Sequence, residues 1–207
     1  MINKLYKALT DNPESELAVD LPEAAVLLPI TDHPKKPEII FTLRAAHLST
    51  HSGEVAFPGG KRDDTDKSLW FTALRESYEE INLAADHVTP LGQLNPLASR
   101  FGLKVVPFVG VIPSQVALTP NLDELDLIFR APLAFFLEPR HLKFEQIEFF
   151  GETYQIPYFC YEQFKIWGLT ALMLVDLLNI GFDAGISCDW PQRDPEIIDK
   201  FVSMKNK

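Results

Sequence analysis

The amino-acid sequence predicts an α+β domain with a mixed β-sheet and helices packed outside it. Short runs rich in apolar and β-branched residues recur along most of the chain and are separated by turn residues. Helical periodicity appears in only a few segments between them. The hydrophobic content is 46% and the chain has 207 residues, which suits a single domain, 1–207, with one buried core. This order of elements favours layers of the α/β/α type.

The elements of the first third follow from turn signals and apolar runs. The first residues carry an amphipathic pattern that ends near Asn12 and Pro13, so we expect a short N-terminal helix within residues 1–20. Two β-branched runs on either side of a turn rich in proline and lysine predict a strand pair, and a further strand should stop at the proline and paired glycines that follow it. These strands are expected at 26–31, 38–43 and 54–57.

Residues 66–83 change to a helical pattern. Apolar and small residues recur there at three- and four-residue intervals, which places them on one face of a helix. They are Trp70, Ala73, Leu74, Ser77 and Ile81. We expect Asn82 to close this helix, because asparagine tolerates the left-handed conformation found at many helix ends.

The second half is predicted to consist mostly of strands. Apolar runs indicate strands at 88–94, 105–112 and 126–129, a short helix after Pro132, a hairpin through 144–150 and 154–158, and a buried helix at 161–178. Pro107 cannot donate a ladder hydrogen bond, so its strand should be an edge strand or a bulged one. The aromatic residues of the hairpin are expected to serve core and hairpin packing, and not to form a ligand-binding surface.

The overall charge limits the classes of partner. The formal net charge is -10 and the pI is about 4.9, so the chain should repel nucleic acid, whereas a small phosphate-bearing molecule could bind beside a cation. The two cysteines, Cys160 and Cys188, have no metal-ligand spacing and fit free thiols of a reducing compartment. The sequence shows neither a secretory leader nor a membrane span. We expect a cytoplasmic monomer or homodimer.

Three glutamates on the predicted helix are the strongest functional signal. Because each residue turns a helix by about 100°, one side of it should carry Glu76, Glu79 and Glu80, beside the apolar stripe. Like charges at this spacing repel one another, and a hard divalent cation such as Mg²⁺ or Mn²⁺ would neutralise them. Arg75 stands four residues before Glu79 and can bind it. The alternative is an ordinary solvated acidic face.

A paired-glycine loop precedes this helix. Gly59 and Gly60 allow a backbone to approach a ligand closely, and the cationic Lys61 and Arg62 follow them. We expect the loop to deliver N–H groups and positive charge beside the acidic face. Taken alone, a Gly-Gly pair is more often only a turn.

The loop and the helix together resemble the Nudix box, here residues 60–83. That pattern contains a glycine, an upstream glutamate, and then Arg-Glu, a hydrophobic residue, any residue, Glu-Glu, any residue, Gly and a hydrophobic residue. The matching residues are Arg75, Glu76, Glu79, Glu80 and Leu83. Ser77 and Asn82 depart from the pattern. Counting six residues from Gly60 gives Asp66 as the upstream acid, but the gap from Asp66 to Arg75 is one residue too long, and the strict spacing falls on Lys67. The resemblance implies a Nudix-type α/β/α sandwich and metal-dependent pyrophosphate hydrolysis.

A longer segment resembles the coenzyme A pyrophosphatase branch of that family. The signature of this branch reads roughly LLTxRSxxLxxHxGxxxFPGG, and residues 40–60 match its spacing, with Ala45 in place of the serine. Residues 166–171 are also similar to this branch. The resemblance spans roughly residues 24–180. It implies hydrolysis of coenzyme A, or of its acyl or oxidised derivatives, to 3′,5′-ADP and 4′-phosphopantetheine.

This resemblance suggests roles for the candidate site residues. The metal is expected at Glu76, Glu79 and Glu80, which would also help to activate a water nucleophile. Arg44 is the first candidate for binding the 3′-phosphate of the substrate, because a guanidinium can bind phosphate through two parallel hydrogen bonds; a structural ion pair is its alternative. The other substrate-binding candidates are His51, Gly59, Gly60, Lys61 and Arg62. Glu124 is a further base or metal ligand, or an ordinary turn acid.

Two alternatives stay open at this point. The chain could be a Nudix pyrophosphatase for another nucleotide, such as ADP-ribose, a dinucleoside polyphosphate or an oxidised nucleotide, with the same fold and metal chemistry. It could also be a Nudix-like domain that binds a nucleotide and regulates without hydrolysis. Ser77, Asn82 and the missing upstream glutamate favour this second alternative, whereas the three retained glutamates favour an enzyme.

Overall fold

The computed structural model describes residues 1–12, 15–48 and 52–205. The helices are α1 (Ile2–Asp11), α2 (Leu69–Ile81), α3 (Leu133–Phe136), α4 (Gly168–Phe182) and α5 (Pro195–Lys205). The strands are β1 (Glu23–Thr31), β2 (Glu38–Arg44), β3 (Val55–Ala56), β4 (Gly59–Lys61), β5 (Thr89–Gln93), β6 (Leu97–Ala98), β7 (Lys104–Ile112), β8 (Leu125–Pro132), β9 (Leu142–Phe149), β10 (Glu152–Tyr161) and β11 (Phe164–Ile166). Short 3-10 helices lie at Ala85–His87, Pro139–His141 and Pro191–Arg193.

The larger of the two sheets is mixed, as the sequence predicts. Its strands follow the order β3-β2-β1-β7-β5, with β4 beside β1, β6 beside β7 and β8 beside β2. The central pair, β1 and β7, is parallel over nine residues, and the other pairs are antiparallel. Both strands of the central pair are buried along most of their length, because the sheet is covered on both faces.

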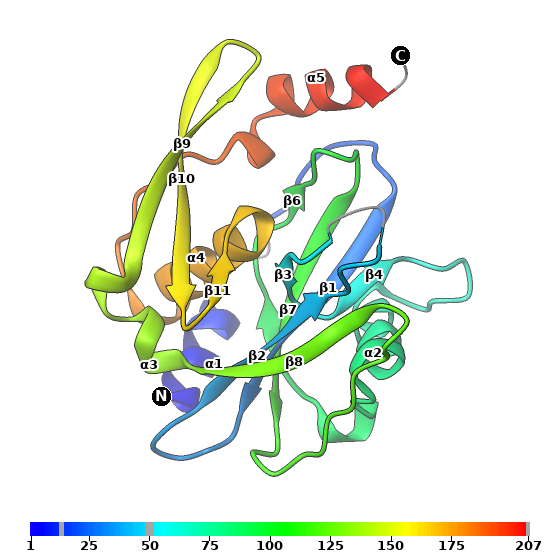
Figure 1. Ribbon diagram of the computed structural model, residues 1–207, viewed down its shortest axis with the longest axis vertical. Coiled ribbons are helices and arrows are strands. Elements are labelled where there is room, and N and C mark those ends of the chain that lie inside the picture. Colours follow the sequence, from blue (N-terminus) through cyan, green and yellow to red (C-terminus); the bar gives the residue numbers. More distant parts are fainter. Residues whose placement is uncertain (13–14, 49–51, 206–207) are drawn as a thin grey trace.

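Helices cover the two faces of this sheet (Figure 1). On one face, α1 and α4 pack against alternate residues of β1, such as Leu28. On the opposite face, α2 packs against the neighbouring residue, Leu27, through Ala73 and Ile81. Successive side chains of a strand point to opposite faces, so a single strand contributes to both cores. The α/β/α layering and the α+β class are therefore confirmed.

A second, three-stranded sheet of order β11-β10-β9 extends from the body as a long hairpin (Figure 1). Stacked aromatic rings join it to the large sheet, with Phe129 of β8 and Phe164 of β11 at 4.0 Å between centroids. The expectation that the hairpin aromatics pack in the core holds for Phe159, which is fully buried. Phe144 and Phe150 lie outside the core, at 42% and 39% exposed, and the ring of Phe150 packs against Phe201 of α5.

The N-terminal helix, Ile2–Asp11, ends just before Asn12, as the sequence predicts. Two other details differ from the prediction. The last long helix begins at Gly168 instead of residue 161, because Tyr161 and Phe164 pair across a turn between β10 and β11. The expected edge position of Pro107 is wrong, because β7 lies inside the sheet. Pro107 faces the gap between β5 and β6, where its carbonyl accepts a hydrogen bond from the backbone N–H of Leu94. No strand in this gap needs a backbone N–H from residue 107, so the missing donor of proline costs no sheet hydrogen bond.

None of the helices in the described part of the chain is long and apolar enough to cross a membrane.

Candidate active site

Helix α2 is held at both ends by local contacts. At its start, the Ser68 side chain accepts a hydrogen bond from the backbone N–H of Phe71, which satisfies one free donor of the first turn. At its end, Asn82 takes the left-handed conformation, with φ 55° and ψ 35°, as the sequence predicts. Ser77 is buried, and its hydroxyl donates to the carbonyl of Ala73, so this departure from the Nudix pattern leaves no unsatisfied polar group.

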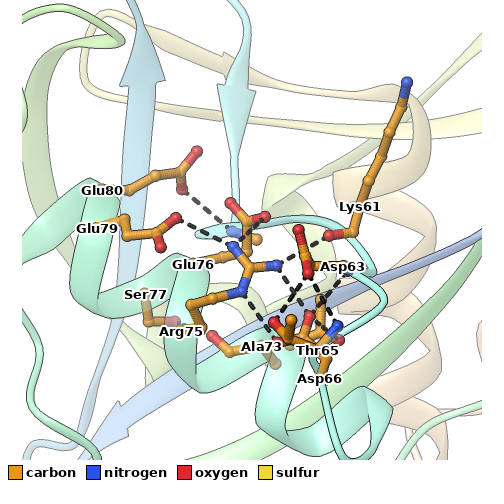
Figure 2. Close-up of polar contacts among 12 residues, drawn as sticks. Lys61, Asp63, Thr65, Asp66, Ala73, Arg75, Glu76, Ser77, Glu79 and Glu80 are labelled. Carbon is orange, nitrogen blue, oxygen red and sulfur yellow. Dashed lines mark hydrogen bonds and ion pairs between the residues drawn. The ribbon is translucent and has the colours of Figure 1, made fainter.

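Arg75 lies at the centre of the acidic residues (Figure 2). One terminal nitrogen donates to Glu76 at 2.9 Å and to Glu79 at 3.0 Å, which confirms the predicted contact with Glu79. The other side of the guanidinium makes two parallel hydrogen bonds to Asp66, both 3.0 Å long, and donates to the carbonyl of Lys61. Arg75 therefore fixes two of the three glutamates and connects them to the glycine loop.

Asp66 is a site residue that the sequence reasoning did not assign. Its carboxylate is buried and also accepts from the backbone of Asp63 and the hydroxyl of Thr72. Hydrogen bonds from Arg75 are the main reason why the pKa of Asp66 lies well below its usual range, and the pKa of Arg75 is raised in turn. The signal in the sequence was an acid at the expected distance from Gly60 but one residue too far from Arg75.

Glu80 is the most deeply buried of the three helix carboxylates, with 5% of its side chain exposed. Among the residues that the structure describes, its one hydrogen-bond donor is the backbone N–H of Gly59 at 3.1 Å, and its other oxygen lies 4.0 Å from the guanidinium of Arg44. Burial raises the pKa of Glu80 to about 8, and the charges of Glu124 and Glu76 add to this rise. These two contacts do not fully compensate the burial of its charge.

Glu124 also comes close to the acidic site. Its negative charge raises the pKa of both Glu76 and Glu80, although burial is the larger cause for each of them. Two backbone hydrogen bonds hold its loop there: Asn121 N–H donates to the carbonyl of Glu80, and Ala45 N–H donates to the carbonyl of Glu124. The structure thus brings a fourth carboxylate beside the helix, although its sequence position gave no spacing relation to the others.

Both positions of the glycine pair need a residue without a side chain, because neighbouring atoms approach the backbone closely there. A Cβ atom at Gly60 would lie 2.4 Å from the carboxyl carbon of Glu76, and one at Gly59 would lie 2.3 Å from the carbonyl oxygen of Ala25. Strand β4, which pairs with β1, therefore has no room for a side chain at either glycine. The loop does deliver a backbone N–H to the acidic face, through Gly59.

The cations that follow the glycines lie apart from this face. Arg62 forms an ion pair with Glu23 of β1 at 2.8 Å. The side chain of Lys61 points away from Arg75 (Figure 2) and borders a hollow of about 440 Å³ that Glu23 and Arg62 also line. His51, another candidate, lies outside the described residues.

The carboxylates suit a divalent cation but are not arranged as a ready-made site. Within residues 1–12, 15–48 and 52–205, no three acidic, histidine or cysteine side chains are gathered as metal ligands. The reason is that Glu76 and Glu79 bind Arg75, while Glu80 turns to Gly59. The donors are nonetheless all carboxylate oxygens, which hard cations prefer, and the buried charge of Glu80 lacks a full counter-charge. These residues therefore fit Mg²⁺ or Mn²⁺.

Replacing Asp66 with asparagine should weaken both the fold and the site. The variant removes a charged partner of the half-buried Arg75, so the free energy of unfolding at pH 7 should fall by about 3 kcal/mol. Because the folded pKa of Asp66 lies below its ordinary value of 3.8, its stabilisation is present above that pH and is lost as the pH falls further. Urea unfolding at pH 7 measures the change.

The exposed neighbour Asp64 provides the control for this variant. Asp64→Asn should change stability by less than about 0.5 kcal/mol. Equal stability of the Asp66→Asn protein and the wild type would contradict the role given to this pair.

Comparisons with known proteins agree with this geometry. A family model described as the NUDIX domain matches residues 21–151. The uncharacterized Nudix hydrolase NudL of Photorhabdus laumondii is 41% identical over 165 residues, which cover 80% of this chain and 88% of that protein. The NudL of an Escherichia coli strain is 39% identical over 163 residues, covering 77% and 83% of the two chains.

A solved structure shows the same fold. The MutT/nudix family protein from Enterococcus faecalis aligns with a TM-score of 0.52 and 12% identity, over 94% of this chain and 83% of that chain. Family model, relatives and fold agree, and enzymes of this family generally use divalent metal ions. The chain therefore belongs to the Nudix hydrolase family and is a pyrophosphohydrolase.

Proposed function

We propose that this enzyme hydrolyses the pyrophosphate bond of coenzyme A, or of its acyl or oxidised derivatives, to 3′,5′-ADP and 4′-phosphopantetheine. One observation carries the proposal. Residues 40–60 resemble the signature of the coenzyme A pyrophosphatase branch, and two residues of this segment lie against the carboxylate of Glu80. The guanidinium of Arg44 is 4.0 Å and the backbone nitrogen of Gly59 is 3.1 Å from its oxygens. The segment that suggests the substrate therefore borders the acidic residues that suit the metal.

The reaction would use the acidic face as follows. Glu80 and Glu76 would hold the divalent cation and Glu79 would complete the set; without the cation, Glu76 and Glu79 are paired with Arg75. A bound Mg²⁺ or Mn²⁺ would neutralise pyrophosphate oxygens and lower the pKa of a water molecule. Glu124 would be the base that accepts the proton of the attacking water; its charge is close enough to raise the pKa of both Glu76 and Glu80, which supports this role.

Product analysis tests the substrate directly. Coenzyme A is incubated with the enzyme and Mg²⁺ or Mn²⁺ in water labelled with heavy oxygen, and the products are identified by mass spectrometry. The proposal expects 3′,5′-ADP and 4′-phosphopantetheine, one of which carries the label. Parallel reactions with ADP-ribose and a dinucleoside polyphosphate test the other specificities. Faster turnover of either compound would contradict the assignment to coenzyme A, and coenzyme A binding without any product would indicate a regulator.

Glu80→Gln should lose activity while keeping the fold. The glutamine has the same shape and no charge to hold the cation, so turnover should fall by about 10²- to 10⁴-fold. Mn²⁺ should raise the melting temperature of the wild type and leave that of the variant unchanged, because a ligand stabilises only the form that binds it. Glu148→Gln, at an exposed position of β9, is the control and should behave like the wild type. Near-normal turnover of Glu80→Gln at saturating Mg²⁺ would refute the role of Glu80.

The stability of the metal-free protein should depend on pH through Glu80. Its pKa rises from 4.5 to about 8 on folding, so between these values the folded state binds more protons than the unfolded state. The free energy of unfolding should therefore fall as the pH rises through this window, by at most about 1.4 kcal/mol per pH unit. Urea titrations in the presence of a chelator measure the slope.

The Glu80→Gln variant separates this effect from other titrations. Its stability should fall less steeply than that of the wild type between pH 5 and pH 8, roughly the window set by the two pKa values. Parallel curves for the two proteins would show that the buried carboxylate is not the cause.

A further inference from the structure

Arg44 is held rigidly at the end of β2. Its backbone N–H donates to the carbonyl of Glu54 at 3.0 Å, and its own carbonyl accepts from Gly53 at 3.1 Å. On the other side, the pairing of β2 with β8 shifts its register between Leu43 and Arg44, which places Arg44 opposite Leu125. These contacts fix the point from which the side chain leaves the sheet.

The guanidinium of Arg44, in contrast, is poorly paired. Only 26% of the side chain is exposed, and its Nε is buried without a hydrogen-bond partner in the described part of the chain. The contact with Glu80 at 4.0 Å is too long for a hydrogen bond. Arg130 on the adjacent strand is equally half-buried, yet it donates to the carbonyls of Ser114 and Val116. A buried cation with unused donors is suited to an anionic ligand.

We propose that Arg44 binds the diphosphate group that is cleaved, and not the 3′-phosphate of the substrate; this inference rests on the proposed function. Glu80 is the buried carboxylate on which the cation site depends, and Arg44 lies beside it. An anion drawn to a cation at Glu80 comes within reach of the guanidinium, which can bind two of its oxygens. The 3′-phosphate is separated from the diphosphate by the ribose. Arg44 would therefore contact the diphosphate that any substrate of this enzyme contains, and not a group that only coenzyme A carries.

The test compares two substrates that differ only in the 3′-phosphate. For Arg44→Ala, kcat/KM should fall by about 10- to 100-fold for coenzyme A and by the same factor for 3′-dephospho-coenzyme A. A loss confined to coenzyme A would overturn the inference. Arg44→Lys retains the charge without the planar fork, so it should show a smaller loss that is again equal for both substrates. It provides the same comparison if the alanine variant folds poorly.

A binding measurement distinguishes substrate contact from mere support of Glu80. Adenosine α,β-methylene diphosphate has a diphosphate and no 3′-phosphate, and its affinity is measured by calorimetry at saturating Mn²⁺. Arg44→Ala should weaken this binding by about 10- to 100-fold and leave the Mn²⁺-induced rise in melting temperature intact. The inference fails if the variant loses the Mn²⁺ effect but binds the analogue normally.

Arg130→Ala is the matched control, because it truncates an arginine of similar exposure on the neighbouring strand, at 31% against 26%. It should lower stability without changing kcat/KM or the analogue affinity. If the wild type hydrolyses neither coenzyme A compound, the proposed substrate is wrong. The analogue measurement still decides the role of Arg44, because it needs no turnover.

Discussion

The proposed active site depends on one electrostatic constraint, the burial of the Glu80 carboxylate without a full counter-charge. A charge removed from water is costly unless it is paired and hydrogen-bonded. Within the described part of the chain, the partners of Glu80 are one backbone N–H and an arginine at 4.0 Å, while Glu76 and Glu124 add negative charge nearby. Such a position is unfavourable for a metal-free protein and favourable for one that binds a cation. This is the physical reason to regard the helix as catalytic and not merely as a solvated surface.

The scaffold maintains this arrangement through short, local devices. Strand β4 carries a glycine, Gly60, at the contact with Glu76, where a side chain would displace the carboxylate. The buried pair of Asp66 and Arg75 orients Glu76 and Glu79 from the opposite side. The loop of Glu124 is hydrogen-bonded both to α2 and to the residue that follows Arg44. Four separate segments of the sequence are thereby fixed around one helix.

Much of this could be predicted from the sequence, because the signals are local. The helical spacing placed the glutamates on one side, and Asn82 ends the helix as its left-handed tolerance suggests. The missed features are those that only tertiary structure decides. The apolar run after residue 161 does not reveal the turn between β10 and β11. Pro107 is tolerated inside the sheet because the neighbouring chain is interrupted between β5 and β6 at this position. Asp66 binds Arg75 although its distance from Arg75 in the sequence is one residue longer than the Nudix pattern has. Arg62 forms an ion pair with Glu23 because β4 pairs with β1.

The most direct test of the central claim is a crystal structure of the protein with Mn²⁺, in which an anomalous difference map locates the metal. The account predicts a peak bonded to the carboxylates of Glu80 and Glu76, with Glu76 turned away from Arg75 to reach it. A peak bound to other residues, or none at saturating Mn²⁺ with Glu76 still held by Arg75, would contradict the account.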